Sequence, residues 1–176
     1  GAAALSVLTE QNYFGGSLNN LRLVRQLVKI PLLRKDFIFD EYQLYQARVA
    51  GADAVLLIAA MLDKNAFCHL QQVAESLDLA VLAEAHTAGE VELLQECGAR
   101  IIGVNARNLR NFSTSLDAVA ELLPQIDDSR IAVAESAINS VTDIASLRRA
   151  GAQAFLVGEK LMRSAAPDQE LRRLRE

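Results

Sequence analysis

The stretch Pro31–Phe37 predicts a short buried β-strand that ends in charged residues. With alternate residues on alternate faces, Lys35 shares a face with Leu33, whereas Arg34 shares the other face with Asp36. An ammonium group at the end of an apolar strand, with a carboxylate beside it, is suited to donating a proton where oxyanion charge develops. The same residues are also consistent with a plain structural ion pair, because such pairs perturb lysines too.

Three other predicted strands also end in polar residues, namely Glu84, Asn105 and Glu135. Each shares a face with apolar residues of its own strand. Buried charges are costly unless they are paired or used, so four such residues in one layer predict a functional cluster with Lys35. Structural roles stay open: an ion pair of Lys35 with Glu84, backbone contacts of Asn105, and capping or orienting by Glu135. His86, just beyond its strand, is interpreted as a helix-start residue rather than a catalytic one.

Short apolar segments alternate with amphipathic helical patterns along the whole chain. Continuous apolar strands between amphipathic helices indicate a parallel sheet covered on its faces. The seven predicted strands occupy residues 4–8, 31–37, 54–60, 80–84, 101–104, 131–134 and 155–158.

A Gly-Ala pair at residues 51, 98 and 151 ends a helix just before a strand, with spacings of 47 and 53 residues. This echo of about two βα units favours a barrel, and no Gly-x-Gly-x-x-Gly follows a strand, which argues against a dinucleotide sheet. We therefore predict an α/β fold, a TIM (β/α)8-type barrel in one domain over residues 1–176. Because a closed barrel needs eight strands, we expect the seven units to be strands 2 to 8 of an N-terminally incomplete barrel.

The composition excludes several classes of protein. The net charge of −4 gives no basic surface for nucleic acid, and no apolar run is long enough to span a membrane. The N-terminus lacks the pattern of a secretory signal. Cys68 and Cys97 fall in helical patterns without metal-ligand spacing, so we expect reduced packing residues and a cytoplasmic protein.

Two segments are candidates for binding a phosphate group, residues 136–139 and 158–160. Barrels often bind phosphate through the loops after their last two strands and a nearby helix N-terminus. The backbone N–H groups of Ala137, Gly158 and Glu159 are the candidate donors. The Glu159 side chain should then point away from the phosphate, and Gly158 is equally consistent with a tight turn.

Several segments resemble the indole-3-glycerol phosphate synthase family of tryptophan biosynthesis. They follow the family's order from residue 4 to about residue 162, and the Lys-Asp-Phe and Asn-x-Arg-Asn-Leu segments are the most specific of them. The matching segments are residues 5–10, 13–17, 31–38, 51–54, 56–58, 82–86, 102–109, 135–136, 156–159 and 161–162.

The resemblance implies a carbon–carbon lyase that needs no cofactor and no metal. Ring closure, decarboxylation and dehydration would convert 1-(2-carboxyphenylamino)-1-deoxyribulose 5-phosphate to indole-3-glycerol phosphate. Lys35 matches the general acid and Glu84 its acid/base partner, whereas Asn105 and Glu135 match positioning residues. The expected substrate contacts match Phe14 and Phe37 for the aromatic ring, Arg107 and Ser136 for the substrate, and Ala137, Gly158 and Glu159 at the phosphate.

The sequence departs from the family pattern in two respects. The family's first strand, with a second lysine and a glutamate of the active site, has no counterpart, and Ala137 replaces a usual glycine. Open sheet edges would also make the chain prone to self-association. The alternatives are another phosphate-binding βα barrel, such as phosphoribosylanthranilate isomerase or a Schiff-base aldolase using Lys35, and an inactive barrel fragment.

Overall fold

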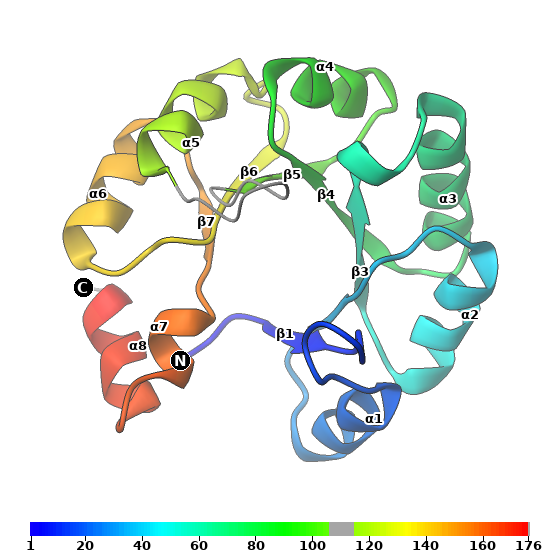
Figure 1. Ribbon diagram of the computed structural model, residues 1–176, viewed down its shortest axis with the longest axis horizontal. Helices are drawn as coiled ribbons and strands as arrows, with labels where there is room; N and C mark the ends of the chain where they lie inside the picture. The colour runs from blue at the N-terminus through cyan, green and yellow to red at the C-terminus, as the bar shows by residue number, and fades with distance from the viewer. Residues whose placement is uncertain (106–114, 176) are drawn as a thin grey trace. The chain divides into compact units, whose positions relative to one another are not determined.

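The computed structural model describes residues 1–105 and 115–175. Within these residues, seven parallel strands alternate with helices, and the strand order in the sheet follows the chain order (Figure 1). The strands are β1 (Leu5–Leu8), β2 (Leu32–Lys35), β3 (Ala54–Ile58), β4 (Ala80–Ala85), β5 (Ile101–Asn105), β6 (Ile131–Glu135) and β7 (Ala154–Leu156). This alternation and this order confirm the predicted α/β fold of TIM-barrel type.

Each strand is followed by at least one helical segment. The α-helices are α1 (Leu18–Leu27), α2 (Glu41–Ala50), α3 (Lys64–Ser76), α4 (Ala88–Glu96), α5 (Leu116–Leu122), α6 (Val141–Arg149), α7 (Glu159–Met162) and α8 (Pro167–Arg175). Two short 3-10 helices, η1 (Ala59–Met61) and η2 (Leu123–Gln125), follow β3 and α5.

The chain divides into two compact units, which we call the N-terminal unit (residues 2–83) and the C-terminal unit (residues 84–176, with Gly1). The prediction of one domain over residues 1–176 stays a prediction. Strand β4 runs through the boundary, so Glu84 is the first residue of β4 in the C-terminal unit.

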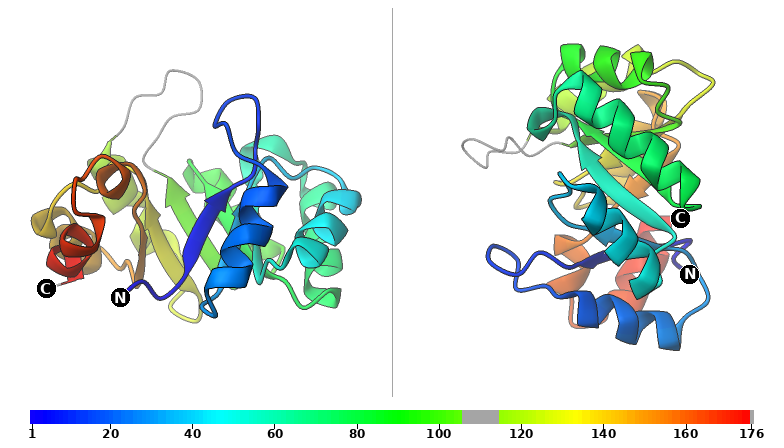
Figure 2. Two further views of the ribbon diagram at one scale, coloured as in Figure 1. Left: turned by 90° about the horizontal axis from the view of Figure 1, so that it is seen from below. Right: turned by 90° about the vertical axis from the view of Figure 1, so that its right-hand side faces the viewer.

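In the N-terminal unit, β1 pairs with β2 and β2 with β3, and helices α1, α2 and α3 lie side by side along them (Figure 1). The β1–β2 register ends with Leu8 opposite Lys35. The loop after β1 rises beyond the carboxyl end of that strand (Figure 2). The large fully buried side chains of this unit include Leu21, Leu32, Leu44, Leu57 and Phe67. Each contributes roughly 1.5–3 kcal/mol by leaving water.

In the C-terminal unit, β6 lies between β5 and β7, in a register that places Glu135 beside Asn105 and beside Leu156. Helices α5 and α6 pack together, and α8 contacts both α6 and α7. Leu94, Ile102, Leu123 and Leu147 fill the core of this unit.

The helix boundaries follow from local chemistry in the sequence. The side chains of Ser17, Asp40, Asp63, Thr87 and Ser140 each accept a backbone N–H at the start of a helix. The glycines of the three Gly-Ala pairs all have positive φ values at helix ends, as predicted from their place before strands.

Several details of the sequence prediction were wrong. The strands predicted over 31–37 and 54–60 end at Lys35 and Ile58, and the second of these is followed at once by the 3-10 helix η1. The last strand ends at Leu156 rather than at Gly158, because Gly158 is already the N-cap of α7. Cys68 and Cys97 are both disulfide-bonded rather than reduced. Among the described residues, the structure contains no helix with the length and apolar character needed to cross a membrane.

Candidate functional site

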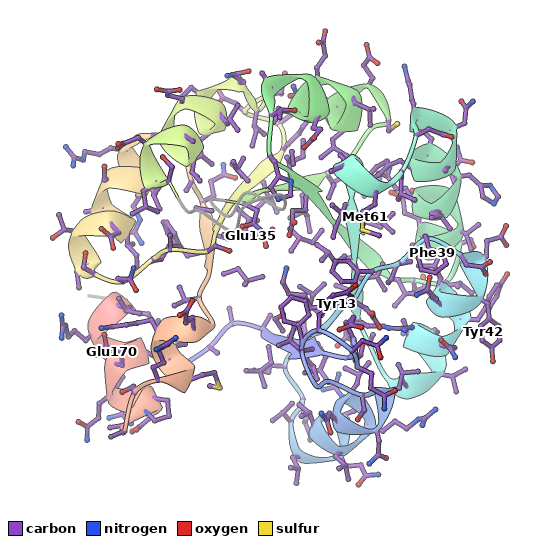
Figure 3. The ribbon with its side chains drawn as sticks, in the orientation of Figure 1. Tyr13, Phe39, Tyr42, Met61, Glu135 and Glu170 are labelled. Atoms are coloured by element: carbon purple, nitrogen blue, oxygen red, sulfur yellow. The ribbon has the colours of Figure 1, made fainter. Side chains whose placement is uncertain are left out.

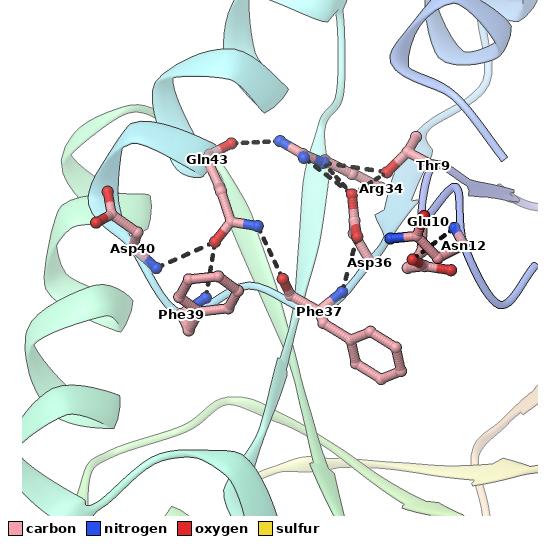
Figure 4. Close-up of polar contacts among 9 residues, drawn as sticks. All are labelled: Thr9, Glu10, Asn12, Arg34, Asp36, Phe37, Phe39, Asp40 and Gln43. Atoms are coloured by element: carbon pink, nitrogen blue, oxygen red, sulfur yellow. Dashed lines mark hydrogen bonds and ion pairs between the residues drawn. The ribbon is translucent and has the colours of Figure 1, made fainter.

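The end of strand β2 is held by a buried polar network on Arg34 (Figure 4). The Arg34 side chain is only 4% exposed, and its Nη2 lies 2.9 Å from Oδ2 of Asp36. Nε of Arg34 donates to the same carboxylate and to Oγ1 of Thr9, and Thr9 Oγ1 in turn donates to Asp36 at 2.6 Å. The carboxylate next to Lys35 is therefore a partner of Arg34, with which it was predicted to share a face of the strand.

Gln43 of helix α2 fixes the segment that follows (Figure 4). Its Nε2 donates to the carbonyl of Phe37 at 2.8 Å, and its Oε1 accepts the N–H groups of Phe39 and Asp40. Its own carbonyl accepts from Nη1 of Arg34. Because Asp36 also accepts the N–H of Phe37 at 2.9 Å, the backbone of Phe37 is held from both sides.

Phe14 and Phe37, the two predicted contacts to an aromatic ring, lie together in the N-terminal unit. The ring centroid of Phe37 is 6.2 Å from that of Phe14 and 6.2 Å from that of Tyr13, which Figure 3 labels on the loop after β1. Glu10 holds this loop, because its carboxylate accepts the N–H groups of Asn12, Tyr13 and Phe14. Tyr13 is 81% exposed, so the cluster offers an accessible apolar surface.

The C-terminal unit carries two buried carboxylates at strand ends. Glu84 is 2% exposed near the end of β4, and Glu135 is 1% exposed at the end of β6, from which it projects in Figure 3. Asn105 is the register partner of Glu135 on β5. A buried carboxylate needs charged or hydrogen-bonding partners to stay ionised, and such groups are enriched in functional sites.

His86 lies between two carboxylates of the C-terminal unit. Its Nε2 is 3.4 Å from Oε1 of Glu84, and its Nδ1 is 3.7 Å from Oε2 of Glu90. Burial favours the neutral ring, but the nearby Glu90 side chain and the charges of Glu84, Glu90 and Glu135 outweigh it and raise the pKa of His86.

The pKa of Glu90 is shifted in the opposite direction. Burial favours its neutral form, but the nearby His86 ring with its charge and the backbone N–H groups of His86 and Thr87 lower the pKa of Glu90. Both shifts favour the charged forms, an imidazolium of His86 beside an ionised Glu90.

The segment after β6, a predicted phosphate loop, has an unusual backbone. Ser136 and Ala137 have φ values of 64° and 56°, in the left-handed region that glycine adopts most easily. The side-chain amide of Asn139 donates to the carbonyl of Ala137 at 2.8 Å and closes the turn.

The second predicted phosphate segment begins helix α7. Gly158 is its N-cap, and Glu159 is its first residue. The Glu159 carboxylate lies 3.0 Å from Nη2 of Arg163, one turn along the helix.

The predicted site residues thus divide between the two units. Lys35, Phe14 and Phe37 belong to the N-terminal unit, and the other described ones belong to the C-terminal unit. Within that unit the structure brings Asn105 beside Glu135. Arg107 lies outside the described residues. Among the described residues, no group of three His, Cys, Asp or Glu side chains is placed to hold a metal ion.

His86 has a contact in the structure that was not predicted from the sequence. It does stand directly before the N-cap Thr87, as expected of a helix-start residue. Its ring, however, also contacts Glu84. The signal was present, because residues two apart at a strand end share a face, and Glu84 and His86 are two apart.

A protein-family model described as indole-3-glycerol phosphate synthase matches residues 1–174. The indole-3-glycerol phosphate synthases of Verminephrobacter eiseniae (strain EF01-2) and Variovorax paradoxus (strain S110) are each 48% identical to this chain, over 174 and 170 residues. The alignments cover 98% and 97% of this chain but 65% and 64% of those relatives. The chain therefore spans less than two thirds of their length.

Solved structures show the same fold at low sequence identity. Thiamine phosphate pyrophosphorylase from Pyrococcus furiosus superposes with a TM-score of 0.75 at 16% identity, covering 99% of this chain and 82% of that one. A mandelate oxidase variant superposes with a TM-score of 0.69, also at 16% identity, covering 98% of this chain and 70% of that one.

Proposed function

Because the chain belongs to the indole-3-glycerol phosphate synthase family, we propose that its residues convert 1-(2-carboxyphenylamino)-1-deoxyribulose 5-phosphate to indole-3-glycerol phosphate. Ring closure forms one carbon–carbon bond, and carbon dioxide and water leave. The observation that carries the proposal is the pair of buried carboxylates, Glu84 and Glu135, at strand ends of a chain that matches the family over residues 1–174.

The proposed roles follow from the chemistry of each group. The Lys35 ammonium donates a proton to the substrate carbonyl oxygen as the carbon–carbon bond forms, and Glu84 moves the proton that must leave later. Asn105 and Glu135 are proposed to position the substrate. Such positioned acid and base groups typically contribute about 10²- to 10⁴-fold each to the rate.

The remaining predicted residues are proposed to bind the substrate. The cluster of Phe14 and Phe37 supports this role for the aromatic ring, because its rings already contact each other and stay partly accessible. Arg107 and Ser136 are proposed to contact polar groups of the substrate. The backbone N–H groups of Ala137, Gly158 and Glu159 are proposed to bind the phosphate.

The test is turnover of the purified 176-residue chain, measured as formation of indole-3-glycerol phosphate. The assay is repeated with the unmatched part of a relative's sequence supplied in trans, because the chain spans only 65% of that relative. Lys35→Ala should lose at least about 10²-fold in kcat while the far-UV spectrum is kept. Lys29→Ala, an exposed lysine before the same strand, is the matched control and should stay active.

Two results would contradict the proposal. If neither preparation forms product, the chain does not carry this activity. If borohydride traps a covalent adduct of Lys35 with a keto-sugar phosphate, the lysine acts through a Schiff base, and the aldolase alternative replaces the proposed one.

A further inference from the structure

We propose that His86 is a positioning residue that holds the carboxylate of Glu84 in place for proton transfer, with Glu90 holding the opposite side of its ring. The inference rests on the proposed function, since it gives a partner to the acid/base residue of that function. It assigns a role to a residue that the sequence indicated only as a helix start.

The geometry places both ring nitrogens of His86 against carboxylates. Glu84 Oε1 lies 3.4 Å from Nε2, and Glu90 Oε2 lies 3.7 Å from Nδ1. Neither ring nitrogen has a hydrogen-bond partner among the described residues, so the two contacts are ion pairs, and these need an imidazolium. The arrangement of carboxylate, ring and carboxylate is therefore suited to a protonated His86.

Burial strengthens the attraction between the His86 ring and the two carboxylates. The side chains of Glu84 and His86 are 2% and 12% exposed, and the Glu90 side chain is 21% exposed. Water screens charges poorly in such a setting, so a cation at 3.4 Å is a strong restraint on a carboxylate. Glu135 adds a third negative charge that acts on the ring, and with Glu84 and Glu90 it raises the pKa of His86.

The backbone of His86 is held by the start of helix α4. The backbone N–H of His86 donates to Oε2 of Glu90 at 2.6 Å, and the hydroxyl of Thr87 accepts the N–H of Glu90 at 3.3 Å. These contacts form a reciprocal cap that ties residue 86 to residue 90. Glu90 thus fixes the backbone of His86 while its charge faces the His86 ring.

A purely structural role for His86 predicts different behaviour. If His86 only precedes the helix cap, its ring matters to stability but not to Glu84. The experiment must therefore measure the interaction of the ring with Glu84 directly. It must also replace the His86 side chain by one that leaves the backbone N–H of residue 86 free to donate to Glu90.

The first measurement is an NMR titration of the histidine ring signals in the 176-residue chain. The chain has only two histidines, and His69→Gln assigns the signal of His86 by elimination. Glu84→Gln removes the charge beside Nε2 with little change of shape. We expect it to shift the titration midpoint of His86 to lower pH, and an unchanged midpoint would overturn the proposal.

The second measurement compares two substitutions of His86 that keep its backbone N–H. The amide nitrogen of Gln reaches about the place of Nε2, near Glu84, whereas that of Asn reaches only that of Nδ1, near Glu90. We expect His86→Asn to lower kcat roughly 10- to 100-fold and His86→Gln to retain more of it. Equal losses that follow a common drop in unfolding free energy would mean that the ring is structural.

The two measurements separate this inference from the proposed function. If the wild-type chain forms no product but Glu84→Gln still shifts the His86 titration, the proposed reaction fails while the pairing of His86 with Glu84 is supported. If the chain is active and both His86 variants keep full kcat, the reaction stands and the inference fails. His69→Gln, an exposed histidine on α3, is the activity control.

Discussion

Arg34 and Asp36 flank Lys35 in the sequence and form an ion pair with each other at 2.9 Å, with side chains 4% and 11% exposed. The pair anchors the end of β2 to Thr9 of the preceding strand's loop and to Gln43 of helix α2. It thereby fixes the backbone on both sides of Lys35. The proposed general acid, Lys35, thus lies on a strand end that is held by a buried hydrogen-bond network.

Asp36→Asn tests how much the Arg34–Asp36 ion pair contributes to the stability of the protein. The amide can still accept the N–H of Phe37, but it leaves the buried Arg34 guanidinium without its countercharge. Removing one partner of a buried ion pair typically costs about 3–5 kcal/mol of unfolding free energy. Urea denaturation of the variant and the wild type measures this difference.

The matched control is Asp168→Asn in helix α8. Asp168 lies 3.7 Å from Arg172, but both side chains are more than half exposed. Exposed pairs of this spacing are worth about 0.3–0.5 kcal/mol. If both substitutions lower the unfolding free energy by the same amount, the buried network around Arg34 stabilises the protein no more than an exposed ion pair does.

Ala137→Gly is expected to stabilise the protein. Ala137 has a φ of 56°, where an L-residue with a Cβ loses roughly 1–2 kcal/mol relative to glycine. The greater freedom of glycine in the unfolded chain offsets part of this gain. We expect a net increase of about 0.5–1 kcal/mol in unfolding free energy, measured by urea denaturation.

The control for this substitution is Ala145→Gly on the exposed face of helix α6. The same chemical change there should cost about 0.5–1 kcal/mol, because glycine is a poorer helix former than alanine. Opposite signs at the two positions would confirm that the turn after β6 is strained by Ala137. A loss of stability at both would contradict that reading.

The alternation of strands and helices was predictable because it depends on local patterns. Apolar runs, capping side chains and the glycine of each Gly-Ala pair mark the elements within a few residues of their observed bounds. The last strand was predicted too long because Phe155-Leu156-Val157 is apolar throughout. Hydrophobicity does not show that Gly158 already caps the next helix.

The site was only partly predictable, for a physical reason. The strand-end rule selected Lys35, Glu84, Asn105 and Glu135, and the structure has these residues at or next to the ends of β2, β4, β5 and β6. The rule also placed Arg34 and Asp36 on one face, but it could not reveal that Thr9 joins this pair, because that contact depends on the register with the loop after β1. The disulfide-bonded state of both cysteines likewise depends on tertiary contacts that no local pattern contains.

The stability of the protein should depend on pH through His86 and Glu90. The raised pKa of His86 contributes stability that is complete below the ordinary value of 6.5 and is lost as pH rises through the folded value. The lowered pKa of Glu90 contributes stability that is present above the ordinary value of 4.5 and is lost as pH falls through the folded value.

The expected result is a difference in unfolding free energy between wild type and His86→Gln that is largest between these two ordinary values. Urea denaturation at half-unit steps from about pH 4 to about pH 8 measures this difference. The range brackets the ordinary pKa values of Glu90 and His86. Glu90→Gln keeps an acceptor for the N–H of His86 but removes the charge, so it should flatten the same dependence. A difference that grows steadily above neutral pH would contradict these assignments.

Glu10→Gln tests whether the loop after β1 positions the aromatic cluster. The Glu10 carboxylate accepts the N–H groups of Asn12, Tyr13 and Phe14 at 2.8, 2.6 and 3.1 Å, and an amide offers one acceptor oxygen in place of two. Losing about one net hydrogen bond of roughly 1 kcal/mol should loosen the loop with little effect on the core. Because Phe14 and Phe37 are proposed to contact the substrate ring, KM should rise several-fold, up to about tenfold for 1.4 kcal/mol, while kcat changes less.

Near-ultraviolet circular dichroism reports the same change without any substrate, because the edge contact of Tyr13 with Phe37 contributes to that signal. Glu75→Gln on helix α3, an exposed glutamate of the same unit, is the control and should alter neither KM nor the spectrum. If Glu10→Gln weakens the spectrum but leaves KM unchanged, the loop is ordered by Glu10, yet Phe14 does not bind the substrate. If kcat falls while KM is unchanged, the loop acts on the chemical step instead, and the role proposed for the aromatic cluster must be abandoned.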